Sequence, residues 1–161
     1  MVEPDDNNRI RAIFLHPESR VTIAEAAPLL GWSSGRMNEA IRDGEIEVAG
    51  TCRNPSVEIA ELVEMALSLW SMTKIERALG SSARKILPPG LRTRRLCTRL
   101  PRYLIDMLQY LAAAERASLE LFLSRELQDL ASARRETLAR ELPAFAEAFD
   151  WPRRNETQPN C

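Results

Sequence analysis

The residues best suited to chemistry are concentrated in one arginine-rich window. Residues 77–105 carry eight basic side chains and no acidic one, whereas the whole chain of 161 residues has a net charge of -1. Arginine supplies 20 of the 22 basic residues, and its planar guanidinium suits phosphate oxygens and guanine edges. A basic window inside an acidic chain therefore predicts nucleic acid as the partner, although charge alone also allows a solvated face or a basic linker.

Other chemistries find little support in the sequence. His16 is the single histidine, and Cys52, Cys97 and Cys161 are scattered without a CxxC pair. There is no Gly-rich phosphate loop and no nucleophile motif, so we expect no enzyme activity, no catalytic residue, no metal site and no cofactor. Residues 1–11 lack the apolar core of a signal peptide, and no window reaches the roughly 18 apolar residues of a membrane span. We expect a cytoplasmic protein that associates with the nucleoid when bound to DNA.

An alternating segment inside the basic window predicts a β-strand. Residues 95–100 alternate with period two, so a strand would separate them onto two faces. Arg95, Cys97 and Arg99 would lie on one face, and Leu96, Thr98 and Leu100 on the other. Pro101 ends the strand and suits the first turn of a helix.

Two amphipathic helices are expected after the strand, the second of them capped by Ser118. Their buried positions would be Leu104, Ile105, Leu108, Leu111 and Ala112 in the first helix and Phe122, Leu123, Leu127 and Leu130 in the second. A lone strand has unpaired backbone groups on both edges, and one strand with two helices has too little core to fold alone. We therefore expect two copies to form a homodimer.

This order of elements resembles the ribbon-helix-helix family of MetJ- and Arc-type repressors over residues 94–131. The family often has Gly shortly before the cap serine, where this chain has Arg116, so either the turn differs or Arg116 adopts an unusual backbone angle. The resemblance implies a two-stranded ribbon in the major groove of double-stranded DNA. It assigns base contacts to Arg95, Cys97 and Arg99, and phosphate contacts to Arg92, Arg94, Arg102 and the helix N-terminus at Ser118 and Leu119.

A second pattern consists of Ala26-Ala27, Leu29-Leu30-Gly31 and Ser33, followed by Ala40-Ile41 and Gly44. It resembles the MerR/excisionase-type helix-turn-helix, whose second helix enters the major groove. The exposed residues of that helix, a second DNA site, would be Ser34, Arg36, Asn38, Glu39 and Arg42. Acidic neighbours, among them Glu45 and Glu47, repel phosphates, so the module could contact a protein instead.

The chain as a whole predicts a mainly α-helical protein with two modules. Residues 1–80 would form the helix-turn-helix-like module, with a polar lead-in over 1–20 that contains a short apolar piece, Ile10 to Leu15, and a small hairpin or wing over 45–54. A helix would follow from Pro55 to about Met72, and Thr73-x-x-Glu76 would cap the next one. Residues 81–91 are expected as a linker, 92–150 as the ribbon-helix-helix dimerisation and DNA-binding domain with an intermolecular antiparallel sheet, and 151–161 as a disordered tail.

These patterns predict a sequence-specific transcriptional regulator that binds DNA as a homodimer. The alternative is an antitoxin or another interaction module, because many ribbon-helix-helix proteins resemble antitoxins whose C-terminal segment wraps a toxin. Residues 132–161 would then contact the partner protein.

Overall fold

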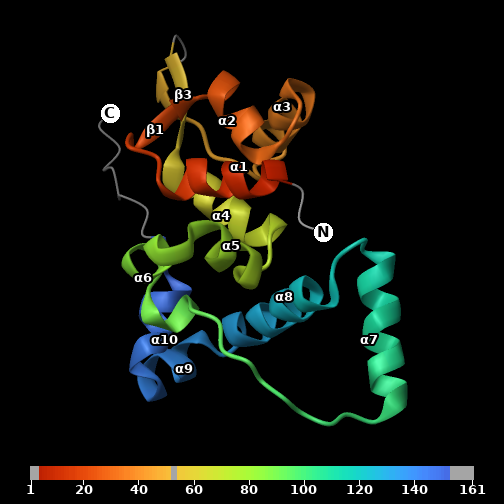
Figure 1. Cartoon of the computed structure of the whole chain (residues 1–161). Helices are drawn as coiled ribbons and strands as arrows, with labels where there is room; N and C mark the ends of the chain where they lie inside the picture. The colour runs from red at the N-terminus through yellow and green to blue at the C-terminus, as the bar shows by residue number, and fades with distance from the viewer. Residues whose placement is uncertain (1–3, 52–53, 153–161) are drawn as a thin grey trace.

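The chain is mainly helical, with one small three-stranded antiparallel sheet (Figure 1). The structure, a computed structural model, describes residues 4–51 and 54–152. The N-terminal elements are α1 (Pro4–Phe14), β1 (Arg20–Thr22), α2 (Ile23–Leu30), α3 (Ser34–Arg42), β2 (Ala49–Thr51), β3 (Asn54–Glu58), α4 (Ile59–Leu69) and α5 (Met72–Leu79). No helix in the described ranges is long and apolar enough to span a membrane.

Helix α1 occupies much of the region that the sequence predicted as a polar lead-in. Ile10 and Ile13 are fully buried and Phe14 nearly so, which gives this polar helix one apolar face. That face packs against α5, α2 and α4. The apolar piece expected at Ile10 to Leu15 supplies this face, but the lead-in prediction missed the helix, because the first two turns of α1 are polar and charged.

The α2–α3 pair has the predicted caps. The Thr22 hydroxyl accepts a hydrogen bond from the Glu25 backbone N–H, and the Glu25 carboxylate accepts one from the Thr22 N–H at 2.9 Å. Gly31 ends α2 with a φ of 71°, in the left-handed region where glycine is favoured. Ser33 caps α3 by accepting a hydrogen bond from the Arg36 N–H at 3.2 Å.

The sheet has the strand order β1-β3-β2. A hairpin is present as β2 and β3, with residues 52–53 between them outside the described part, but it begins later than the predicted 45–54, because residues 45–48 form no strand. A helix starting at Pro55 was wrong, because residues 54–58 form the central strand and the helix begins at Ile59. Val57 pairs with Val21 of β1 and is fully buried, so strand pairing overrides local helix propensity here.

The segment after α5 is folded into short helical turns. These are η1 (Gly80–Ser82), α6 (Ala83–Ile86) and η2 (Pro89–Leu91), and they cover the predicted linker. Leu87 is fully buried and belongs to the same apolar core as α1 and α4. The predicted Thr73 cap was wrong, since Ser71 caps α5 by accepting a hydrogen bond from the Lys74 N–H at 3.4 Å.

The C-terminal elements are α7 (Arg102–Ala114), α8 (Leu119–Ser132), α9 (Arg135–Glu141) and α10 (Pro143–Phe149). Figure 1 shows α7 standing apart from the N-terminal elements, at the end of a long extended segment. Helix α10 packs on α9 and η2, and Trp151 stacks on Phe14 with ring centroids 6.1 Å apart. The predicted disordered tail lies, from residue 153 onward, outside the described residues.

Candidate nucleic-acid interface

The segment between η2 and α7 is extended and exposed along its length. Every residue from Thr93 to Tyr103 is exposed, and the apolar side chain of Leu96 is 87% exposed. The segment is neither helical nor buried, and in this single chain it forms no strand. The two-face separation predicted for residues 95–100 needs a strand partner, so it stays a prediction.

Both ends of this segment are held. At its start, the Thr93 backbone N–H donates to the Glu76 carboxylate at 2.8 Å, and the Thr93 hydroxyl donates to the same carboxylate. At its end, Pro101 precedes the first turn of α7. No local sequence pattern indicates the Glu76–Thr93 contact, because it joins residues 17 positions apart.

The predicted phosphate-binding arginines differ in their surroundings. The Arg92 guanidinium donates to the backbone carbonyl of Arg84 at 2.8 Å and to that of Leu87 at 3.4 Å. Arg94 is exposed on the extended segment, and Arg102 is exposed on α7 with Asp106 at 3.8 Å. Arg92 thus anchors the segment to the end of α6, whereas Arg94 and Arg102 are open to a ligand.

Helices α7 and α8 are joined by a short turn and run in clearly different directions in Figure 1; we call the pair the helical hairpin. The Ala117 N–H donates to the Ala112 carbonyl at 3.0 Å and the Arg116 N–H to the Ala113 carbonyl at 3.1 Å, the pattern of a Schellman turn. Arg116 has a φ of 54°, which confirms the unusual backbone angle. Ser118 caps α8 as predicted, accepting a hydrogen bond from the Leu121 N–H at 3.2 Å.

The hairpin leaves much of its apolar surface uncovered. Ala112 and Phe122 are buried, in agreement with the two stripes read from the sequence. Ile105 and Leu111 of α7 and Leu127 and Leu130 of α8 were expected to be buried, but all four are exposed in the single chain, because the described residues do not cover them. The other exposed apolar residues here are Leu96, Leu100, Tyr103, Met107, Tyr110 and Leu119.

A hydrogen bond ties α8 to the N-terminal elements. The Arg125 guanidinium donates to the Ser68 carbonyl, close to the end of α4, at 2.7 Å and lies 3.8 Å from the Glu115 carboxylate. The hydrogen bond attaches α8 to α4, whereas it makes no contact with the helical residues of α7. Arg125 and Ser68 are far apart in the sequence, so no local pattern indicates the role of Arg125.

The second predicted site, on α3, is exposed but electrostatically compensated. Ser34, Arg36, Asn38 and Arg42 all lie on the exposed side of the helix. Arg36 pairs with Glu45 at 2.7 Å and lies 4.9 Å from the centre of the Trp32 ring, while Arg42 pairs with Asp43 at 3.2 Å. A phosphate would have to compete with these carboxylates, which weakens its attraction to the face.

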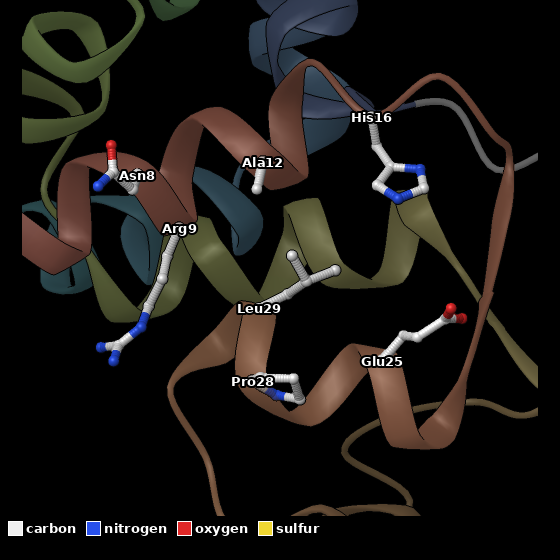
Figure 2. Close-up of a pocket in the computed structure, with 7 residues that line it drawn as sticks. All are labelled: Asn8, Arg9, Ala12, His16, Glu25, Pro28 and Leu29. Carbon is white, nitrogen blue, oxygen red and sulfur yellow. The ribbon is translucent and has the colours of Figure 1, made fainter.

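A groove between α1 and α2 was not anticipated from the sequence. Figure 2 shows Asn8 and Arg9 at one end, His16 and Glu25 at the other, and Leu29 between them. Its volume is about 460 Å³. Hydrogen bonds from the Thr22 backbone, and next from the Thr22 side chain, hold the pKa of Glu25 below its ordinary value. Glu25 is therefore engaged in capping α2, and the groove's polar ends serve the fold.

No cluster of three or more His, Cys, Asp or Glu side chains suited to a metal ion occurs among the described residues. Comparison of the chain with models of protein families, with curated proteins and with solved structures finds no match. The function is therefore inferred from the exposed arginine-rich segment and the α7–α8 pair described above.

Proposed function

We propose that this protein is a homodimeric, sequence-specific DNA-binding regulator whose residues 95–100 form a two-stranded ribbon with a second copy. The observation that carries the proposal is the exposed extended segment, rich in arginine, that leads into an exposed amphipathic hairpin. Both features are unfavourable in isolation. A partner that pairs with the backbone groups and covers the leucines would stabilise both features, and the exposed arginines of the segment attract an anion.

Antiparallel pairing of two segments would satisfy the backbone groups of both. It would also bring the side chains of Leu96 and Leu100 toward the uncovered faces of the hairpins. Arg95, Cys97 and Arg99 from each copy would then project from the opposite face of the ribbon. A ribbon of this width fits the major groove, where an arginine fork can donate hydrogen bonds to both guanine O6 and N7.

Phosphate contacts would flank the ribbon. Arg94 and Arg102 are exposed at the two ends of the segment, and the N-terminus of α8 at Ser118 and Leu119 is exposed beside the turn. Free N–H groups at such a terminus favour a phosphate oxygen. Arg92, held by backbone carbonyls, instead sets where the segment leaves the N-terminal elements.

The α2–α3 pair with its adjoining hairpin would serve as an auxiliary module. Its shape suits a helix-turn-helix contact through Ser34, Arg36, Asn38 and Arg42, whereas its ion pairs with Glu45 and Asp43 favour a modest contribution to affinity. We assign base selection to the ribbon and leave α3 a secondary contact.

Selection from a pool of randomised duplexes, followed by gel-shift titration of the enriched sequence, tests the proposal. Replacing Arg95 or Arg99 by Ala should weaken binding about 5- to 150-fold and relax base preference, since a bidentate contact is worth about 1–3 kcal/mol. Arg140→Ala is the matched control, because Arg140 is exposed on α9, away from the basic segment. Failure to enrich any duplex, or equal binding by all three variants, would refute DNA recognition by the ribbon.

The interaction role of residues 132–161 has less support from the described part of that segment. Helices α9 and α10 fold back, and Gly90 lies so close to α10 that a Cβ there would be 2.7 Å from the Ala148 Cβ. Phe145 and Phe149 are half-buried and stack on each other, so they are not displayed for a partner. If DNA affinity proves insensitive to salt, this alternative becomes the better explanation.

A further inference from the structure

A cavity lies where the C-terminal helices meet the N-terminal elements, and we call it the junction cavity. It has a volume of about 260 Å³ and is lined by residues of α4, α8, α10 and η2 together with Trp151. Trp70, just after α4, is nearly buried in its wall. The cavity therefore touches four segments that are far apart in the sequence.

The lining is aromatic and carries no ionisable side chain. Trp70, Trp151, Phe145 and Phe149 supply ring surfaces, and the last two stack with centroids 5.1 Å apart. The side chain of Gln128 adds a donor and an acceptor. The Arg135 guanidinium lies 5.3 Å from the centre of the Phe149 ring but is paired with Asp150, so a charged ligand finds no free partner there and the cavity favours a neutral molecule.

The size of the cavity limits the molecule to a small one. Ligand sites commonly enclose about 300–1,000 Å³, so a volume of about 260 Å³ is just below the smallest of them. It equals the liquid volume of about nine water molecules, which corresponds to roughly ten non-hydrogen atoms. One or two fused rings with a single polar group fit these limits.

We propose that the junction cavity binds a small uncharged aromatic molecule, whose rings pack on the tryptophan and phenylalanine side chains and whose polar group pairs with Gln128. Ser124, exposed on α8 at the rim, controls entry. Because the lining joins α8 to α4, an occupant stabilises the placement of the hairpin on the body. An effect on DNA affinity rests on the proposed function, but binding to the cavity does not.

Titration of the full-length protein with 2-naphthol, monitored through the three tryptophan side-chain N–H signals in NMR spectra, tests the proposal. The signals of Trp70 and Trp151, assigned by Trp→Phe substitution, should shift together and saturate. The signal of Trp32 should not move, because Trp32 is absent from the lining. The charged analogue 2-naphthoate should bind at least about tenfold more weakly, since its carboxylate would be desolvated without a partner.

Ser124→Trp should fill the entrance and weaken 2-naphthol binding about tenfold or more, the effect expected of overpacking a formed site. Glu126→Trp introduces the same side chain at an exposed position of α8 outside the lining and should bind like the natural chain. Gln128→Ala, which cannot block the site, should weaken 2-naphthol more than naphthalene. Equal shifts at all three tryptophans, equal binding of naphthol and naphthoate, or unchanged binding by Ser124→Trp would each overturn the inference, whatever the outcome of the DNA experiments.

Discussion

Replacing Leu127 by Ala should weaken self-association while leaving the single chain folded. Leu127 is 62% exposed on α8, although it continues the apolar stripe that contains the buried Phe122. Burying a whole leucine side chain is worth about 1.5–3 kcal/mol, so covering the exposed part is worth about 1–2 kcal/mol. A symmetric dimer contains the residue twice, which raises the expected loss to about 2–4 kcal/mol. Since about 1.4 kcal/mol is a factor of ten, the dissociation constant should rise from about 30-fold to several hundred-fold.

Sedimentation equilibrium over a series of protein concentrations measures this change directly. Leu15→Ala is the control, because Leu15 is an exposed leucine just after α1. The substitution removes the same atoms far from the α7–α8 pair. Circular dichroism of each variant establishes that the helices remain. If the natural chain is a folded monomer at micromolar concentration, or if both variants associate like the natural chain, the uncovered face of α8 is not a dimer interface.

Three further perturbations follow from individual contacts. Arg116→Gly should raise the free energy of unfolding by about 0.5–1 kcal/mol in urea titration, because a left-handed residue costs about 1–2 kcal/mol and glycine entropy offsets part of the gain. Arg92→Ala should lower stability but leave the salt dependence of DNA affinity unchanged, whereas Arg94→Ala should reduce the slope of log affinity against log salt by about one. The pKa of Glu25 is lowered in the folded chain, so its stabilising contribution is present above the ordinary pKa of 4.5 and lost as the pH falls through the folded-state pKa. Glu25→Gln should therefore flatten the acid-side fall in the urea midpoint.

Local signals in the sequence predicted the helix ends well. Thr22, Ser33 and Ser118 act as caps and Gly31 ends a helix, because capping depends on a side chain and backbone groups within three residues. The unusual angle at Arg116 was one of two outcomes that the resemblance to the ribbon-helix-helix family left open. Each of these features is decided within one turn of chain, which is the range over which sequence patterns are most informative.

Long-range pairing accounts for most of the errors. Residues 54–58 pair with the distant strand β1 as well as with the adjacent β2, and α1 is stabilised by packing on α5. Glu76 was predicted to cap a helix together with Thr73, but its carboxylate accepts a hydrogen bond from the distant Thr93 N–H. The junction cavity belongs to the same class, since its walls come from segments that only the folded chain brings together.

The exposed segment and the exposed face of α8 lead to a prediction about the order of assembly. The extended segment 95–100 and the leucines that the described residues leave exposed can both be covered by the same second copy, so the proposed ribbon and the dimer core should form in one step. DNA binding then requires two chains, and at protein concentrations below the dimer dissociation constant its occupancy should rise with the square of concentration. Leu127→Ala keeps every arginine of the ribbon, so its affinity for DNA should fall in dilute solution and recover once the chain is concentrated enough to pair. Arg95→Ala should show no such recovery, because it removes a contact and leaves the pairing intact. If both variants respond alike to protein concentration in a gel-shift series, DNA binding by the arginine-rich segment does not depend on self-association. That result would refute the ribbon.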